Sequence, residues 1–245
     1  MTRLENLCRF YDLMDQLRIR LGGTLTLDRC SGRLGWPQRG VYFLFENHES
    51  RSDSEAGLRV VRVGTHALSL NSRTTLWNRL AQHAGSKKSG AGNHRGSIFR
   101  LLVGEALKNR AGVEEPKSWG FGSHPGEAGN RLGMTTAEIR AQEHDHERAV
   151  SCYICAMPFL FVAASDAPGP GCDRALIERN SIALLSNYRR EPIDAASAEW
   201  LGRSSGRDRV RASGLWNSNH VDEACDPTFL SALTKAIKQT VALSL

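Results

Sequence analysis

Long apolar runs are absent from this chain of 245 residues. No stretch approaches the about 18 consecutive apolar residues of a bilayer-spanning helix, and residues 1–6 lead into no signal-like apolar core. These two absences predict a soluble, cytoplasmic protein without a membrane partner. The length suits one well-buried α/β domain and is marginal for two, so we expect a single domain over residues 1–245.

Cysteine is also sparse. The chain has six cysteines spread along its length, whereas disulfide scaffolds are small and dense in cysteine. We therefore expect reduced thiols, at Cys8, Cys30, Cys152, Cys155, Cys172 and Cys225.

One group of residues nevertheless invites a zinc interpretation. His144 and His146, followed by Cys152 and Cys155, supply donors of the kind that zinc takes. If the two cysteines lie on a strand, their separation of three points them to opposite faces. No second Cys-x-x-Cys completes a standard site, so core thiols are the favoured interpretation. A protein-interaction module with a structural zinc ranks last.

Signatures of two catalytic classes are missing as well. The chain has no Walker-type Gly-Lys-Ser/Thr motif and no Gly-x-Ser-x-Gly elbow to support Ser-His-Asp catalysis. Basic residues are in excess, with 32 Lys and Arg against 26 Asp and Glu and a net charge of +6. This balance favours contact with a polyanion without identifying one.

The N-terminal third predicts a helix followed by a hairpin. Apolar residues recur at close to a 3.6 period over residues 4–21, which end before a glycine pair. The β-branched and aromatic run 41–45 predicts a central, buried strand. After a polar loop over 47–57, residues 58–63 form a second strand, and the two strands make a β-hairpin.

A basic helix follows the hairpin. It is expected from about residue 76, with Ser72 or Thr74 as its cap. Arg79 and His83 lie four residues apart and therefore share a face of this helix.

The rest of the chain predicts helices, loops and one strand. They are a glycine-rich basic loop over 85–96, a helix from Ile98, a loop over 112–133, a charged helix over 135–150, a strand over 153–162 interrupted by Pro158, and helices over 173–188 and 227–243.

Three short stretches form the most specific pattern in the chain. The first strand opens with Gly40-Val41-Tyr42, the second closes with Arg62-Val63-Gly64, and the next helix carries Arg79. A tyrosine on one strand, a glycine that ends its neighbour and an arginine one helix later form the layout of the GIY-YIG nucleases, which this chain resembles. The resemblance covers about residues 40–83 and 174–188.

The resemblance implies an α/β (α+β) fold, with a small mixed or antiparallel sheet flanked by helices. The family-like core then spans about residues 38–83 and 150–190. A helical insertion occupies about residues 84–149, and a helical C-terminal extension occupies about residues 191–245.

The resemblance also implies roles for individual residues. Tyr42 acts as general base or positions the attacking water, and Arg79 stabilises the phosphate. Glu178 holds Mg²⁺ (or Mn²⁺) through its carboxylate, and Asn187 stands where the family has an asparagine near the end of that helix. Glu178 follows two apolar residues, and a carboxylate beside a buried stripe is costly unless it pairs or binds a cation.

Each of these residues has a plainer interpretation that stays open. In the plainer interpretation, Glu178 is a solvated glutamate that lies near two arginines. Tyr42 is then a core aromatic residue with a hydrogen-bonded hydroxyl, and Arg79 is a surface cation.

Arg62 departs from the family pattern, because it stands where the second motif normally begins with tyrosine. A guanidinium stays protonated at neutral pH and cannot act as a base. Arg62 can instead bind phosphate, while His66 or His83 takes over the lost hydrogen bond. The departure also leaves open a catalytically inactive, nucleic-acid-binding descendant.

The basic loop and its surroundings are candidates for contact with the phosphate backbone. A glycine-rich loop that runs into a helix N-terminus favours anions. The predicted nucleic-acid-binding residues are Lys87, Lys88, His94, Arg95 and Arg100. A solvated, flexible loop is the alternative, and the basic segment 203–211 has the same two interpretations.

The sequence as a whole predicts an Mg²⁺-dependent DNA endonuclease that hydrolyses phosphodiester bonds. Phosphodiester hydrolysis needs an activated water, a divalent cation and positive charge around the phosphate, and the chain offers a candidate for each. Asn187, His83 and His94 are second-rank candidates beside Tyr42, Arg79, Arg62 and Glu178. An endonuclease that cuts both strands of a duplex often needs two active sites, so a homodimer is one possible state of the protein.

Overall fold

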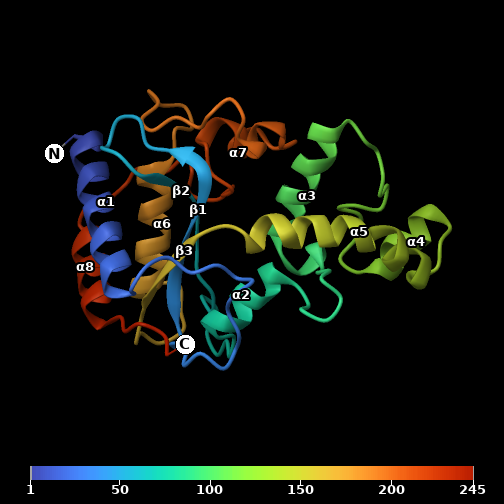
Figure 1. Cartoon of the computed structure of the whole chain (residues 1–245), viewed down its shortest axis with the longest axis horizontal. Helices are drawn as coiled ribbons and strands as arrows, with labels where there is room; N and C mark the ends of the chain where they lie inside the picture. The colour runs from blue at the N-terminus through green and yellow to red at the C-terminus, as the bar shows by residue number, and fades with distance from the viewer. Residues whose placement is uncertain (1, 245) are drawn as a thin grey trace.

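A computed structural model describes residues 2–244 as a small sheet covered by helices on both faces (Figure 1). The sheet is antiparallel, with the order β2-β1-β3. Its strands are β1 (Gly40–Ser50), β2 (Leu58–Gly64) and β3 (Phe159–Ala163). The expected α+β fold, the hairpin and the central position of its first strand are confirmed. Within the described residues, no helix has both the length and the apolar character needed to cross a membrane.

One face of the sheet is covered by helices from both ends of the chain. Val41, Phe43 and Phe45 alternate along β1 and belong to the core on this face. A capping box formed by Thr2 and Glu5 starts the first of the covering helices. These helices are α1 (Arg3–Arg20), α6 (Asp173–Leu185) and α8 (Phe229–Gln239).

The second face carries the remaining helices of the core. Tyr42 and Leu44 point to this side, where Trp200 and Trp216 also pack. The elements here are α2 (Leu76–Ala84), η1 (His94–Gly96), α3 (Ile98–Ala111), α5 (Thr136–Cys155), η2 (Leu201–Ser204) and α7 (Asp208–Ser213). Residues beyond 191 therefore contribute to both cores rather than forming an appended tail.

The strand predicted over 153–162 is wrong in its first half. Helix α5 continues to Cys155 because Val150 and Ile154 extend its buried stripe at helical spacing. The strand begins only after Pro158, whose carbonyl accepts a hydrogen bond from the backbone of Phe45. Cys152 therefore lies on a helix and not on a strand.

The predicted loop over 112–133 contains a further helix. Helix α4 (Pro125–Leu132) begins with proline at its first position, where the missing N–H costs nothing, and ends at Gly133 in the left-handed conformation. Figure 1 shows α4 beside α5, at the end of the molecule away from the sheet.

Gly64 is required by the packing of Tyr42. The two residues are register partners on β1 and β2, and the tyrosine ring lies directly over the glycine. A Cβ at Gly64 would overlap the hydroxyl and ring of Tyr42, and even the Cε2 atom would be only 2.9 Å away. The requirement is one of space, because Tyr42 is fully buried and has nowhere to move.

The substitution Gly64→Ala is expected to destabilise the fold by about 1–3 kcal/mol, because overpacking forces the backbone or the ring to shift. Urea unfolding measures this change. Gly96→Ala is the matched control, since a Cβ there meets nothing within 4 Å. Equal stabilities of the two variants would contradict the proposed close packing.

Candidate active site

A cavity of about 520 Å³ brings together three residues that the sequence singled out. Arg62 comes from β2, Arg79 from α2 and Glu178 from α6. The segment 216–220 and the exposed residue Arg207 complete the wall. One carboxylate therefore faces a cavity with several cations around it.

Glu178 is half-buried and only partly hydrogen-bonded. The backbone N–H of Thr65 donates to Oε1 over 3.1 Å, and Oε2 has no hydrogen-bond partner among the residues that the structure describes. Burial raises the pKa of Glu178, and the cations Arg62 and Arg79 offset part of that effect. Removing this ionised carboxylate from water is unfavourable, and its free Oε2 can bind a ligand that offsets that loss of solvation.

Arg62 is a buried cation at this cavity. Its Nη1 donates to the carbonyl of Trp216, and its guanidinium lies over the ring of Phe99 at 4.5 Å. Nε is buried without a partner among residues 2–244. Burial lowers the pKa of Arg62, but a guanidinium keeps its charge at neutral pH. Arg62 therefore contributes positive charge to the cavity and cannot serve as a base.

Tyr42 and His83 form a hydrogen-bonded line behind the cavity wall. The Tyr42 hydroxyl is 2.7 Å from His83 Nε2, and His83 Nδ1 is 2.8 Å from the Ser97 hydroxyl. Neither Tyr42 nor His83 has exposed surface. Burial, followed by the cation Arg79, holds the pKa of His83 well below its usual range. His83 is therefore neutral at pH 7, with one ring nitrogen donating and the other accepting.

His66 does not take part in this line. Its Nε2 lies 3.2 Å from the carbonyl of Gln38, and burial lowers the pKa of His66 to about 4. Of the two histidines expected to compensate for Arg62, His83 is the one that contacts the tyrosine.

Asn187 does not line the cavity, so the geometry does not support a catalytic role for it. Its side-chain carbonyl accepts from Arg3 over 2.7 Å, and its amide donates to the carbonyl of Ile193 over 3.0 Å. Helix α6 ends at Leu185, so Asn187 belongs to the turn that follows it. The residue ties the start of the chain to this turn.

The geometry does not support the predicted nucleic-acid contacts of His94, Arg95 and Arg100, because all three side chains are buried against helix α5. Arg95 forms a bidentate ion pair with Glu143, both N–O distances being 2.7 Å. Arg100 Nε donates to Glu147 over 3.0 Å.

His94 has the same environment. Its Nδ1 lies 2.9 Å from Glu147, and its Nε2 accepts from the backbone of Gly120. The ring stacks on Trp119 at 3.9 Å. Lys87 and Lys88 are exposed, so their contact with nucleic acid stays a prediction.

Sequence reasoning missed the far wall of the cavity. Asn217 and His220 lie in a segment held on the edge of β2, where the Trp216 N–H donates to the carbonyl of Val61 over 2.8 Å. The asparagine side chain bonds both backbone groups of Val63. The only local signal was the polar run Asn217-Ser218-Asn219-His220, which follows a tryptophan.

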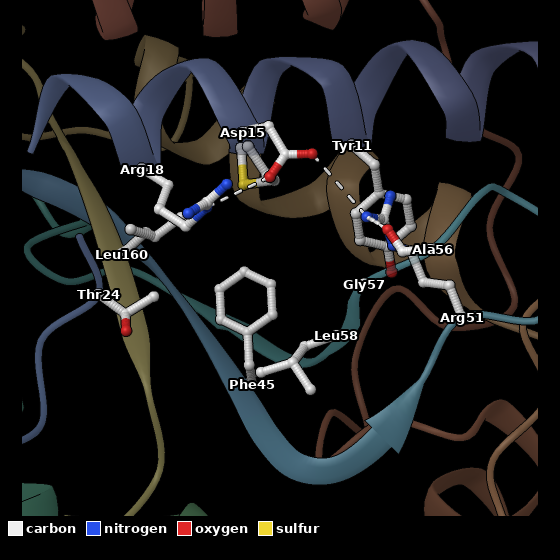
Figure 2. Close-up of a pocket in the computed structure, with 11 residues that line it drawn as sticks. Tyr11, Asp15, Arg18, Thr24, Phe45, Arg51, Ala56, Gly57, Leu58 and Leu160 are labelled. Carbon is white, nitrogen blue, oxygen red and sulfur yellow. Dashed lines mark hydrogen bonds and ion pairs between the residues drawn. The ribbon is translucent and has the colours of Figure 1, made fainter. Parts of the chain in front are cut away.

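A second cavity, of about 350 Å³, lies between α1 and the sheet (Figure 2). Phe45, Leu58 and Leu160 form its apolar side, and Asp15 faces two arginines across its rim. None of the predicted site residues lines this cavity, so it is separate from the site described above.

A divalent cation has one candidate ligand at the site. No group of three or more His, Cys, Asp or Glu that could hold a metal exists within residues 2–244, which leaves the zinc interpretation without support. His146 lies 3.0 Å from the carbonyl of Gly104, and Cys155 contacts the carbonyl of Ala84. Glu178 fits magnesium, which binds through one or two carboxylates and takes waters and phosphate oxygens as its other ligands.

Comparison with known proteins gives one match. A family model described as "GIY-YIG domain" matches residues 1–243. No curated protein and no solved structure matches the chain significantly.

Proposed function

Because this chain belongs to the GIY-YIG family, whose members are endonucleases, we propose that it is a divalent-metal-dependent DNA endonuclease. The observation that carries the proposal is the meeting of Arg62, Arg79 and Glu178 at one cavity, next to the line from Tyr42 to His83. These residues come from separate elements of the fold, so local sequence similarity alone does not account for their convergence.

The cations of the cavity suit a phosphodiester. In hydrolysis the phosphate gains negative charge on its non-bridging oxygens as water attacks. Arg79 is half-buried at the wall, and among the described residues its Nη1 has only the Gln82 side chain as a partner, at 3.1 Å. Together with Arg62, it provides fixed positive charge in a partly dehydrated site, where electrostatic stabilisation is strong.

The line from Tyr42 to Ser97 suits the handling of a water proton. With the His83 proton on Nδ1, Ser97 accepts from it and Nε2 accepts from the Tyr42 hydroxyl. The tyrosine oxygen then keeps a free lone pair, which a water reaches only when the wall that buries Tyr42 opens toward the cavity. A neutral histidine behind the hydroxyl also offers a place for its proton when the water is deprotonated.

Glu178 would hold the divalent cation through its free Oε2. When bound, such a cation acts as a Lewis acid on the phosphate. Glu178 also brings negative charge to the surroundings of Arg62, which offsets part of the effect of burial on the pKa of that guanidinium. A homodimer belongs to the proposal where the substrate is a duplex cut in both strands, and sedimentation tests it.

Incubation of the purified chain with supercoiled plasmid and with single-stranded DNA, each with Mg²⁺ or EDTA, tests the proposed activity. Cleavage is expected with Mg²⁺ only, and Tyr42→Phe is expected to lower the rate by about 10²-fold or more, because it removes the hydroxyl that His83 orients. Tyr11→Phe is the matched control, since this buried tyrosine lies in the core on the opposite face of the sheet. Equal rates for the two variants would reject the proposed role of Tyr42.

A nucleic-acid-binding protein without turnover is the second candidate, favoured by the arginine at position 62. A gel shift of DNA by the wild type, without cleavage under any metal condition, would support it. Cleavage that first appears in Arg62→Tyr would then identify this residue as the cause of the loss.

A further inference from the structure

His220 faces the cavity but has no part in the reaction as proposed so far. It shares the wall with Arg79 and Glu178. The preceding residues are fixed to β2 by the backbone bond of Trp216 and the side-chain bonds of Asn217. The sheet therefore holds the imidazole at the site, although His220 lies more than 150 residues after Gly64 in the sequence.

A carboxylate orients the imidazole ring of His220. Its Nδ1 lies 2.8 Å from Glu223 Oε1. Burial opposes ionisation of Glu223, but hydrogen bonds from His220 and Arg179 outweigh it and lower the pKa of this carboxyl. An ionised carboxylate only accepts, so the proton of that bond belongs to Nδ1.

The other ring nitrogen is left for a ligand. Nε2 of His220 has no hydrogen-bond partner among the described residues, and the side chain is 31% exposed. The backbone of His220 has a φ of 63°, a conformation that non-glycine residues adopt rarely and mainly at special positions. His220 thus has an unfavourable backbone conformation, and its Nε2 is free to bind a ligand.

Resting on the proposed nuclease function, we propose that His220 is the general acid that protonates the leaving oxygen and that Glu223 is its positioning residue. The water gives one proton to the line from Tyr42 to His83, and its oxygen forms a bond to phosphorus while the bond to the leaving bridging oxygen breaks. The electron pair of the broken bond stays on that oxygen, which takes the proton from Nε2 of the imidazolium. His220 regains a proton from solvent before the next turnover.

A sulfur-substituted substrate tests the role directly. Products of wild-type cleavage identify which bridging oxygen leaves, and an oligonucleotide carrying sulfur at that position is then compared with ordinary DNA. Thiolates leave without protonation, so a missing general acid matters little for the sulfur substrate. The variant is His220→Asn, because asparagine tolerates a positive φ and has no acidic proton to give.

We expect His220→Asn to cut ordinary DNA about 10²-fold to 10³-fold more slowly than the wild type and to cut the sulfur substrate within a few-fold of the wild-type rate. Glu223→Gln should show the same pattern with a smaller loss. Equal losses on both substrates would overturn the role of His220, because a structural defect slows both reactions alike.

Failure of the underlying function gives a different result. A wild type that cuts neither substrate rejects the nuclease proposal itself, whereas a wild type that cuts both supports it regardless of His220. The unfolding midpoint of His220→Asn, measured in urea, should match that of the wild type.

Discussion

Glu178→Gln is expected to lower DNA cleavage by about 10³-fold while making the folded protein more stable at neutral pH. The amide keeps the shape of the side chain and can still accept from the Thr65 N–H. It removes the negative charge that would hold a divalent cation. Initial rates of plasmid cleavage measure the first effect, and urea unfolding measures the second.

The stability gain follows from the direction of the pKa shift. Burial raises the pKa of Glu178 above its ordinary value of 4.5, so the folded chain binds this proton more readily than the unfolded chain does. The wild type therefore loses stability as the pH rises from the ordinary pKa through the raised one. Glutamine has no proton to lose, so its advantage appears above about pH 4.5 and disappears below it.

Glu114→Gln is the matched control, because this glutamate is exposed and should change neither quantity. Cleavage by Glu178→Gln within ten-fold of wild type would reject the catalytic assignment. A variant less stable than wild type at pH 7 would show instead that the carboxylate stabilises the fold. A cation that binds the wild type and not Glu178→Gln, measured by calorimetry without DNA, would establish the metal ligand independently of activity.

The near wall of the cavity could be predicted because its residues belong to local patterns. The hairpin places Tyr42 opposite Gly64, and a helix follows directly with Arg79. Such motifs depend on residues that lie close together in the sequence. Turn and strand signals depend on the same short range, so both can be identified without the structure. The same reasoning explains why β1 was correctly placed at the centre of the sheet.

The far wall could not be predicted in the same way. His220 reaches the cavity only because Trp216 pairs with Val61 across a long sequence separation, and this pairing leaves no periodic pattern. A lone histidine in a polar run is usually a surface residue. The position of Asn187 failed for a related reason, since its side chain is engaged by Arg3 from the opposite end of the chain.

Burial of His94, Arg95 and Arg100 was missed although helix α5 carried a signal for it. Glu143 and Glu147 lie four residues apart on the stripe that also contains Ile139, Val150 and Ile154. Carboxylates on an apolar stripe require cationic partners. The sequence predicted only a charged helix here, and its two buried carboxylates were not matched with Arg95 and Arg100.

Arg100→Met is accordingly expected to cost about 3–5 kcal/mol of folding free energy, because it leaves a buried charge without its partner. Arg100 is fully buried, and its guanidinium donates to the Glu147 side chain, to Ser151 and to the carbonyl of His83. Burial alone would raise the pKa of Glu147, but hydrogen bonds from His94 and the cation Arg100 lower it overall. Urea unfolding measures the cost.

The pH dependence of this cost separates a buried ion pair from a nucleic-acid contact. Without Arg100, Glu147 becomes easier to protonate in the folded state, so the difference between wild type and variant should shrink as the pH falls below about 4.5, the ordinary pKa of this glutamate. Arg148→Met on the same helix is the matched control, since its side chain is 58% exposed and the expected change is about 0–1 kcal/mol. Were Arg100→Met as stable as Arg148→Met but weaker in DNA binding, Arg100 would be a backbone contact after all. A large loss at pH 7 that fades in acid instead identifies Arg100 as the cation that keeps α5 and the start of α3 together.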